Sequence, residues 1–94
     1  MADKHDCGKP DLTLVPRGMA VAIARALEFG AAKYGRGTYS QPPLVERERY
    51  LAAVLRHIFA DLDGERLDEE SGLPHLFHAA GALAMLLSRK DEHT

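Results

Sequence analysis

The segment LPHLFHAAGALAMLLSR, Leu73–Arg89, decides the fold, because a helix formed from it would be apolar on almost every side. Pro74 suits the first turn of such a helix, where its fixed φ fits and no backbone donor is needed. One stripe of apolar side chains recurs at helical spacing: Leu76, Ala80, Leu83 and Leu87. Alanine, methionine and leucine fill most of the remaining surface. A helix that is apolar all round must be surrounded, so we expect it to lie at the centre.

Two earlier segments have the spacing of amphipathic helices. The first extends from Pro16 to about Tyr34, and the second from about Leu44 to Leu62. Each carries apolar residues at intervals of three and four, which place them on one helix face. The prolines in Gln41-Pro42-Pro43 separate the two helices. Alternating β-branched runs are absent, so the expected fold class is all-α with three main helices.

The length and composition favour one small globular domain. Apolar residues make up 46% and charged residues 28% of the 94 residues, which is ordinary for such a domain. Three helices from so short a chain cannot easily surround the third one. We therefore expect the bundle to be completed by a symmetric homo-oligomer. We assign residues 1–11 to a flexible N-terminal arm and residues 12–90 to a single helical domain.

Several classes of protein do not fit this sequence. A formal net charge of −2 offers no basic surface for nucleic acid. No run of 18 apolar residues is present, so we expect no membrane-spanning helix. Cys7 is the single cysteine, which excludes an internal disulfide and fits a reducing cytoplasm.

Carboxylates and histidines gather where the second expected helix gives way to the third. His57 and Asp61 are four residues apart and share a helix face, as do His75 and His78, which are three apart. A short connection makes the two helices antiparallel neighbours, so these residues meet at one corner. Carboxylates and imidazoles there suit Mg²⁺ or Mn²⁺, which can hold a polyphosphate. The candidate metal ligands are His57, Asp61, Glu65, Asp68, Glu70, His75 and His78.

Simpler explanations exist for each of these residues. Acids in a loop are usually solvated, and Asp68, Glu69 and Glu70 could instead stabilise the N-terminus of the third helix. A histidine on a half-buried helix is more often structural than a ligand. For the whole set, however, the spacing of the histidines favours a metal site.

The segment FGAAKYGRGTY, Phe29–Tyr39, places cations and aromatics at the end of the first helix. Lys33 and Arg36 fit a helix C-terminus, where the dipole favours positive charge. They also fit phosphate contacts from a glycine-flanked loop, with Tyr34 or Tyr39 stacking on a base. Arg56, directly before His57, is the other candidate phosphate ligand.

The sequence resembles the small phage and bacterial dATP/dGTP diphosphohydrolases, which are related to the MazG-like all-α nucleoside triphosphate pyrophosphohydrolases. The resemblance covers about Lys9 to Leu87. Its most specific parts are Gly30-x-x-Lys33-Tyr34-Gly35, Arg56-His57, Gly64-Glu65 and Asp68-x-Glu70-Ser71-Gly72-Leu73-x-His75-x-x-His78. The MazG signature, EExxE followed by ExxD, is absent in literal form.

The resemblance implies hydrolysis of a purine deoxynucleoside triphosphate, dGTP or dATP, to the monophosphate and pyrophosphate. Metal ions would hold the triphosphate, and Glu65, Asp68 or Glu70 would orient the attacking water. Lys33, Arg36 or Arg56 would offset charge on the leaving pyrophosphate. MazG-like enzymes assemble as dimers or tetramers, in agreement with the apolar third helix.

Two other functions compete with hydrolysis. A non-catalytic helical oligomerisation or regulatory module would explain the apolar surface without any turnover. A compact DNA-binding helical domain would require strong salt-dependent binding, which the mild acidity disfavours.

Overall fold

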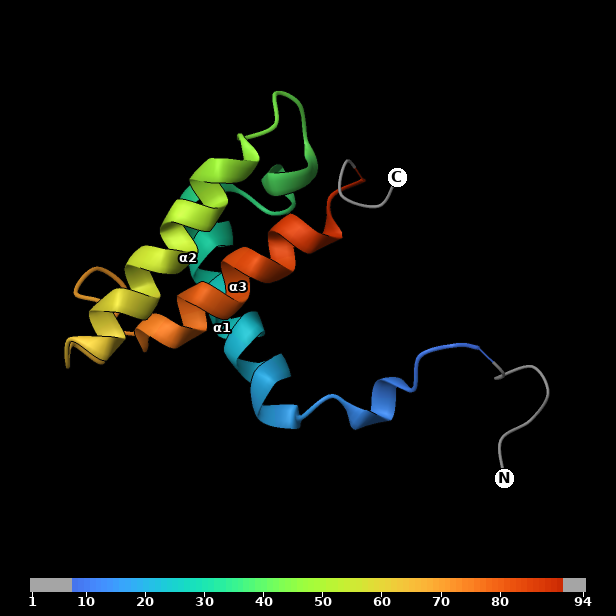
Figure 1. Ribbon diagram of the computed structural model, residues 1–94. Coiled ribbons are helices and arrows are strands. Elements are labelled where there is room, and N and C mark those ends of the chain that lie inside the picture. Colours follow the sequence, from blue (N-terminus) through green and yellow to red (C-terminus); the bar gives the residue numbers. More distant parts are fainter. Residues whose placement is uncertain (1–7, 91–94) are drawn as a thin grey trace.

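The computed structural model describes residues 8–90 and consists mainly of three α-helices (Figure 1). They are α1 (Arg17–Tyr34), α2 (Arg47–Leu62) and α3 (His75–Ser88). Short 3-10 helices cover Leu12–Leu14 and Thr38–Ser40. The described residues contain no strand, only an isolated bridge between Leu67 and Pro74. The expected all-α class with three main helices is therefore confirmed.

The helix boundaries follow from local chemistry. Pro16 precedes α1, and Gly35 ends it with φ 93°, a value that favours glycine, while its N–H donates to the Ala31 carbonyl at 2.9 Å. The α2 helix begins at Arg47, about three residues later than the sequence predicts. The buried Arg89 explains the delay, because its Nη1 donates to the Val45 carbonyl at 2.5 Å and holds that residue outside the helix.

The α3 helix packs against both of the other helices, as its apolar sequence predicts. Val54 of α2 and Ala79 and Ala82 of α3 form the core cluster, with Tyr50 and Ile58 packed against it. On the other side of α3, helix α1 approaches so closely that a Cβ on Gly81 would lie 2.7 Å from the Ala26 Cβ. Small residues thus set the distance between the helices.

The connection between α2 and α3 is a closely hydrogen-bonded loop. Gly64, with φ 96°, reverses the chain after α2. The His75 N–H then donates to the Arg66 carbonyl and the Asp68 N–H to the Leu73 carbonyl, both at 2.8 Å. These bonds fold the loop back on itself, so its acids stand beside the first turn of α3.

Many apolar side chains remain exposed on this single chain. The buried apolar residues among those described are Ala22, Ala26, Val54, Ala79, Ala82 and Leu86. Most of these are alanines, which bury little area each and so stabilise the fold only weakly. By contrast, Phe59 and Leu62 of α2 are 58% and 72% exposed, and Leu87 of α3 is 60% exposed. The expected homo-oligomer would cover such residues, and it remains a prediction.

The segment before α1 runs away from the three helices (Figure 1). Leu12 and Leu14 are 76% and 78% exposed there. Residues 1–7 of the expected flexible arm lie outside the described residues, as do residues 91–94. Within the described part of the chain, no helix is long and apolar enough to cross a membrane.

Candidate metal and phosphate-binding site

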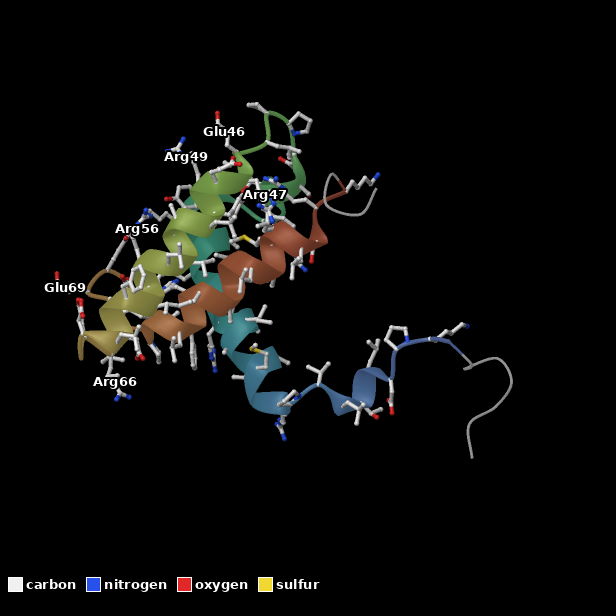
Figure 2. The ribbon with its side chains drawn as sticks, in the orientation of Figure 1. Glu46, Arg47, Arg49, Arg56, Arg66 and Glu69 are labelled. Atoms are coloured by element: carbon white, nitrogen blue, oxygen red, sulfur yellow. The ribbon has the colours of Figure 1, made fainter. Side chains whose placement is uncertain are left out.

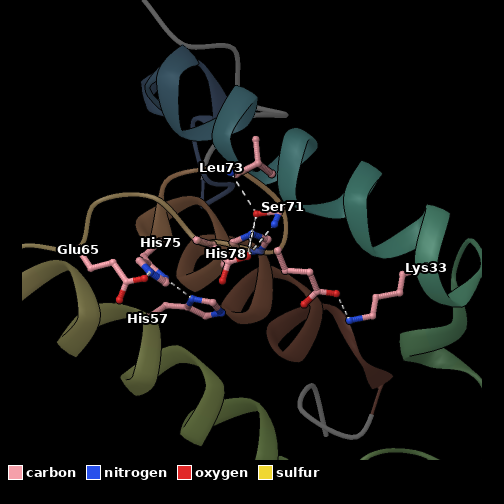
Figure 3. A network of polar contacts seen from close by, with 9 residues as sticks. Lys33, His57, Glu65, Ser71, Leu73, His75 and His78 are labelled. Carbon is pink, nitrogen blue, oxygen red and sulfur yellow. Dashed lines mark hydrogen bonds and ion pairs between the residues drawn. The ribbon is translucent and has the colours of Figure 1, made fainter.

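Three histidines from α2 and α3 converge at the corner between these helices (Figure 3). His57 Nδ1 lies 2.8 Å from His75 Nδ1, which is a hydrogen bond between two ring nitrogens. The His78 ring stacks on that of His57, with centroids 4.9 Å apart, and meets the edge of Phe29. The sequence prediction that these histidines share one corner agrees with this geometry.

Asp68 joins the histidines from the loop. Its Oδ2 accepts hydrogen bonds from the Ser71 N–H at 2.9 Å and the Ser71 hydroxyl at 3.0 Å. The same hydroxyl lies 2.6 Å from His78 Nε2 and accepts from the Leu73 N–H at 3.1 Å. Ser71 therefore links the acid, the histidine and the loop backbone. His57, Asp68 and His75 each offer one possible ligand atom, and these three atoms lie within 4.8 Å of one another. This spacing would allow all three side chains to bind the same ion.

His75 is the buried member of this cluster, with 6% of its surface exposed. Its Nε2 is buried and has no hydrogen-bond partner. Glu65 Oε1 lies 3.6 Å from this nitrogen, too far for a hydrogen bond in this conformation. A buried ring nitrogen without a hydrogen-bond partner is costly, so this atom needs an explanation.

The site favours neutral imidazole and ionised carboxylate. Burial, together with the nearby His78 and His75, lowers the pKa of His57 below its ordinary value of 6.5. Burial alone would raise the pKa of Asp68, but the two hydrogen bonds from Ser71 and the adjacent histidines outweigh it and lower the pKa. At neutral pH His57 is therefore uncharged and Asp68 is charged, which is the state in which both can bind a cation.

A groove of about 1210 Å³ begins at this cluster and follows the ends of α1 and α2. It exceeds the roughly 300–1,000 Å³ of ordinary small-molecule sites, so a nucleotide can fit. His57, Asp68 and His78 line one part of it. The rest of its polar and aromatic lining includes Lys33, Tyr34, Arg36, Tyr39, Arg49, Tyr50, Arg56 and Glu70.

The groove carries several positive charges despite the acidity of the chain. Lys33 forms a short contact with Glu70, which raises the pKa of the lysine. Arg36, Arg49 and Arg56 make no ion pair within residues 8–90. Arg49 and Arg56 are seven residues apart and so leave the same side of α2 (Figure 2). Unpaired guanidinium groups along a groove suit a polyanion.

The structure separates the remaining predicted ligands from the cluster. Asp61 lies with its Oδ1 3.7 Å from Arg66 Nε and does not line the groove. The Glu65 side chain is 53% exposed and points toward His75 rather than into the groove. Glu70 lines the groove but is occupied by Lys33. The histidines and Asp68 are thus the compact part of the predicted set.

Sequence reasoning missed two contributors. Ser71 stands three residues after Asp68, a spacing at which a carboxylate can accept from the backbone and hydroxyl of a turn. Arg49 stands seven residues before Arg56, two helical turns along the same face. Both spacings are visible in the sequence, but they point to a site only when the position of the groove is known.

A family model for the dATP/dGTP diphosphohydrolase N-terminal domain matches residues 1–94. This chain belongs to that family. A protein of Salmonella phage PMBT28 named dATP/dGTP diphosphohydrolase is 36% identical over 83 residues, which cover 88% of this chain and 28% of the phage protein. The chain thus corresponds to about a quarter of that relative. No solved structure matches the chain significantly. The resemblance seen in the sequence is confirmed at the level of the family.

Proposed function

We propose that this chain hydrolyses a purine deoxynucleoside triphosphate, dGTP or dATP, to the monophosphate and pyrophosphate with a divalent cation, Mg²⁺ or Mn²⁺. The observation that carries the proposal is the position of the cluster of His57, Asp68 and His75 beside a groove lined with cations. A metal site next to unpaired arginines suits a triphosphate, since both parts stabilise negative charge. The name of the phage relative agrees with this substrate class.

The donor groups fit a divalent cation. The cluster offers imidazole nitrogens and a carboxylate oxygen, and His75 retains an unpaired buried nitrogen. When bound, such an ion supplies Lewis-acid polarisation of a phosphoryl oxygen and lowers the pKa of coordinated water. The protein's own part is to hold Asp68 ionised through Ser71 and to keep His57 neutral.

The cations of the groove would bind the phosphates. Arg56 lies next to His57 in sequence and lines the groove beside the cluster. Lys33 comes from the opposite side, at the end of α1, and its contact with Glu70 is exposed to solvent. A triphosphate can therefore replace Glu70 as the partner of Lys33. The two cations would then offset charge on the leaving pyrophosphate.

Release of Glu70 gives that carboxylate a role. Once Lys33 contacts phosphate, Glu70 is free at the groove and can orient a water molecule toward the α-phosphorus. We therefore assign the orientation of water to Glu70 among the predicted acids, with Asp68 as a metal ligand. Glu65 does not line the groove, so its effect on the reaction is indirect.

Aromatic residues at the groove suit the base. Tyr34 and Tyr39 line it beside Arg36, and Tyr50 lines it from α2. The Tyr50 ring is partly engaged, because the Arg89 guanidinium lies over it at 5.2 Å. Lys33 Nζ also lies 5.2 Å from the centre of the Tyr34 ring, but Tyr34 is 68% exposed, so part of its ring is available for stacking. We assign the base to the end of the groove near Tyr34 and Tyr39.

Chromatographic analysis of products from each canonical dNTP tests the proposal. We expect dGTP or dATP to yield the monophosphate and pyrophosphate only when a divalent ion is present. Glu70→Gln should lower kcat at least tenfold, whereas Glu69→Gln, in the same loop but with no hydrogen bond or ion pair among the described residues, should not. Orthophosphate as the first product would contradict the proposed bond cleavage.

The exposed apolar surface favours a second candidate, a domain that mainly mediates assembly. Phe59 and Leu62 are available for contact with another chain or another domain. This candidate predicts a stable oligomer that turns over no triphosphate.

A further inference from the structure

The short turn ahead of α1 exposes its apolar side chains although its backbone is fixed. Asp11 Oδ1 closes this 3-10 turn by accepting hydrogen bonds from the Thr13 N–H at 3.0 Å and the Thr13 hydroxyl at 2.6 Å. Leu12 and Val15 are three residues apart, so they lie on the same side of the turn, and Leu14 is exposed beside them. We call residues 11–15 the leading turn. A preformed turn loses little conformational entropy when it binds another surface.

The leading turn projects away from the three helices of its own chain (Figure 1). Val15 and Pro16 join it to α1, and both have an extended backbone, with ψ of 123° and 135°. Proline fixes its own φ and disfavours a helical conformation in the residue before it, so this joint is stiff. The leading turn is therefore held away from its own helices.

A second groove, of about 450 Å³, lies where the first half of α3 meets the start of α1 and the end of α2. Met19, Ile58, Leu76 and Leu83 are among its lining residues, none of which is charged or polar. It shares no lining residue with the groove beside the histidines. We call it the apolar groove. A nucleotide would find no polar partner there, whereas an apolar segment suits it.

The leading turn and the apolar groove lie next to each other along the chain. The groove includes Gly18 and Met19, which follow Pro16 by only two and three residues. The chain would have to reverse at its stiff joint to place the turn in its own groove. The same proximity brings the base of each turn to the edge of a groove. Two copies related by a two-fold axis can therefore each place the turn in the groove of the other.

The area available also favours a reciprocal contact. Removing one leucine or valine side chain from water buries roughly 100 Å². Three such side chains from each of two leading turns, together with the groove surface that they cover, bring the buried area to about 1,000 Å², which a specific interface should reach. A single turn in a single groove would bury only half as much.

We propose that two copies of this chain exchange their leading turns, each inserting Leu12, Leu14 and Val15 into the apolar groove of the other. Exchange of an identical segment is a low-cost route to a dimer, and it covers both apolar surfaces at once. The proposal specifies the contact surfaces of the expected homo-oligomer. It does not depend on the proposed function, because neither surface belongs to the groove assigned to the nucleotide.

Cross-linking between cysteines distinguishes exchange from folding back. Chains carrying Leu14→Cys and chains carrying Leu83→Cys, all with Cys7→Ser, should be co-expressed and mildly oxidised. A disulfide requires Cα atoms within about 7 Å, so it reports insertion of the turn into the groove. We expect a disulfide that joins the two different chains, identified by peptide mass spectrometry. Leu87→Cys, one turn farther along α3 and outside the apolar groove, is the matched control and should not be cross-linked to Leu14→Cys.

Two results of this experiment would overturn the proposal. A disulfide that forms only within single chains of the double variant Leu14→Cys/Leu83→Cys would show that each turn occupies its own groove. No disulfide in either sample would show that the leading turn does not occupy the groove.

Sedimentation measures how much the leading turn contributes to assembly. The double variant Leu12→Ser/Leu14→Ser should raise the dissociation constant of the dimer at least tenfold. Its helix content by circular dichroism should not change, because the turn lies outside the three helices. Leu67→Ser, at an exposed leucine of the loop between α2 and α3, is the control and should associate as the parent protein does. An unchanged dissociation constant in the double variant would contradict the proposal.

Discussion

At the scale of single residues, His57 connects the fold to the site. It lies on α2, contacts His75 through a ring nitrogen and stacks on His78. The neutral form that metal binding needs is already favoured in the folded protein, because burial and the other histidines lower the pKa. The same shift makes the stability of the fold depend on pH.

The stability of the metal-free protein should fall as the pH drops from 7.5 to 5.5. Because the folded-state pKa of His57 is below the ordinary value of 6.5, the unfolded chain binds more protons in this range. The stabilisation is complete above about pH 6.5 and is lost as the pH falls below it. Thermal melts at the two pH values measure this, and a His57→Asn variant should show a smaller drop. Equal drops in both proteins would contradict the assignment to His57. Asp68 contributes outside this window, since its lowered pKa lies below 3.8.

Gly81 sets the approach of α1 to α3. Gly81→Ala should destabilise the fold by about 1–3 kcal/mol, because the added Cβ would lie 2.7 Å from the rigid Ala26 Cβ and force the helices apart. Chemical denaturation measures the change. Gly30→Ala in α1, where nothing lies within 4 Å, is the control and should leave stability unchanged or raise it by up to about 1 kcal/mol. Equal stability of the two variants would show that α1 and α3 are farther apart at Gly81 than the structure indicates.

The spacing of residues in the sequence predicted part of the site. The three- and four-residue spacings placed His57, His75 and His78 at one corner, as the structure does. The same reasoning also placed Asp61 there, yet its carboxylate lies near Arg66. The reason is that the chain reverses at Gly64, so the acids that follow, and not Asp61, face the histidines. Spacing along a helix predicts shared faces, but it cannot predict where a loop returns.

At the scale of elements, the proposed site depends most on the loop between α2 and α3. It carries Asp68 and Ser71, and its backbone bonds to α3 fix both beside His78. The sequence predicted an acidic turn here. It could not predict the hydrogen bonds, which depend on the left-handed backbone of Gly72 and on the bridge between Leu67 and Pro74.

Ser71→Ala should weaken both this loop and the metal site. The substitution removes the hydroxyl contacts to Asp68 and His78 and leaves the Leu73 N–H unpaired. We expect a loss of about 1–3 kcal/mol in the free energy of unfolding, together with weaker Mn²⁺ binding. Ser88→Ala, whose exposed hydroxyl makes no hydrogen bond among the described residues, is the control. Unchanged stability and Mn²⁺ affinity in Ser71→Ala would show that the loop does not depend on this hydroxyl.

At the scale of the whole molecule, the small core explains why the chain should assemble. The sequence predicted a central apolar helix and, from it, a missing partner. The structure agrees that α3 lies between the other helices. Which surface a partner covers could not be predicted, because every helix carries apolar residues beyond those that its own neighbours bury.

The α2 surface of Leu55, Phe59 and Leu62 offers a test of assembly. These residues are 50%, 58% and 72% exposed and share one face. We expect the protein to sediment as a dimer or tetramer, and Phe59→Glu to shift it toward monomer with little loss of helix. Leu67→Glu, at an exposed leucine of the loop, should not change the sedimentation. A monomeric parent protein at tens of micromolar would contradict the expected oligomer.

The central claim concerns one bond in a nucleotide, so product identity tests it most directly. Purified protein should be incubated with dGTP and with dATP in the presence of Mn²⁺, and the products resolved by chromatography. The structure and the family predict equal amounts of the nucleoside monophosphate and pyrophosphate, at a rate that Asp68→Asn abolishes. Release of orthophosphate, or no turnover by folded, metal-loaded protein, would contradict the account.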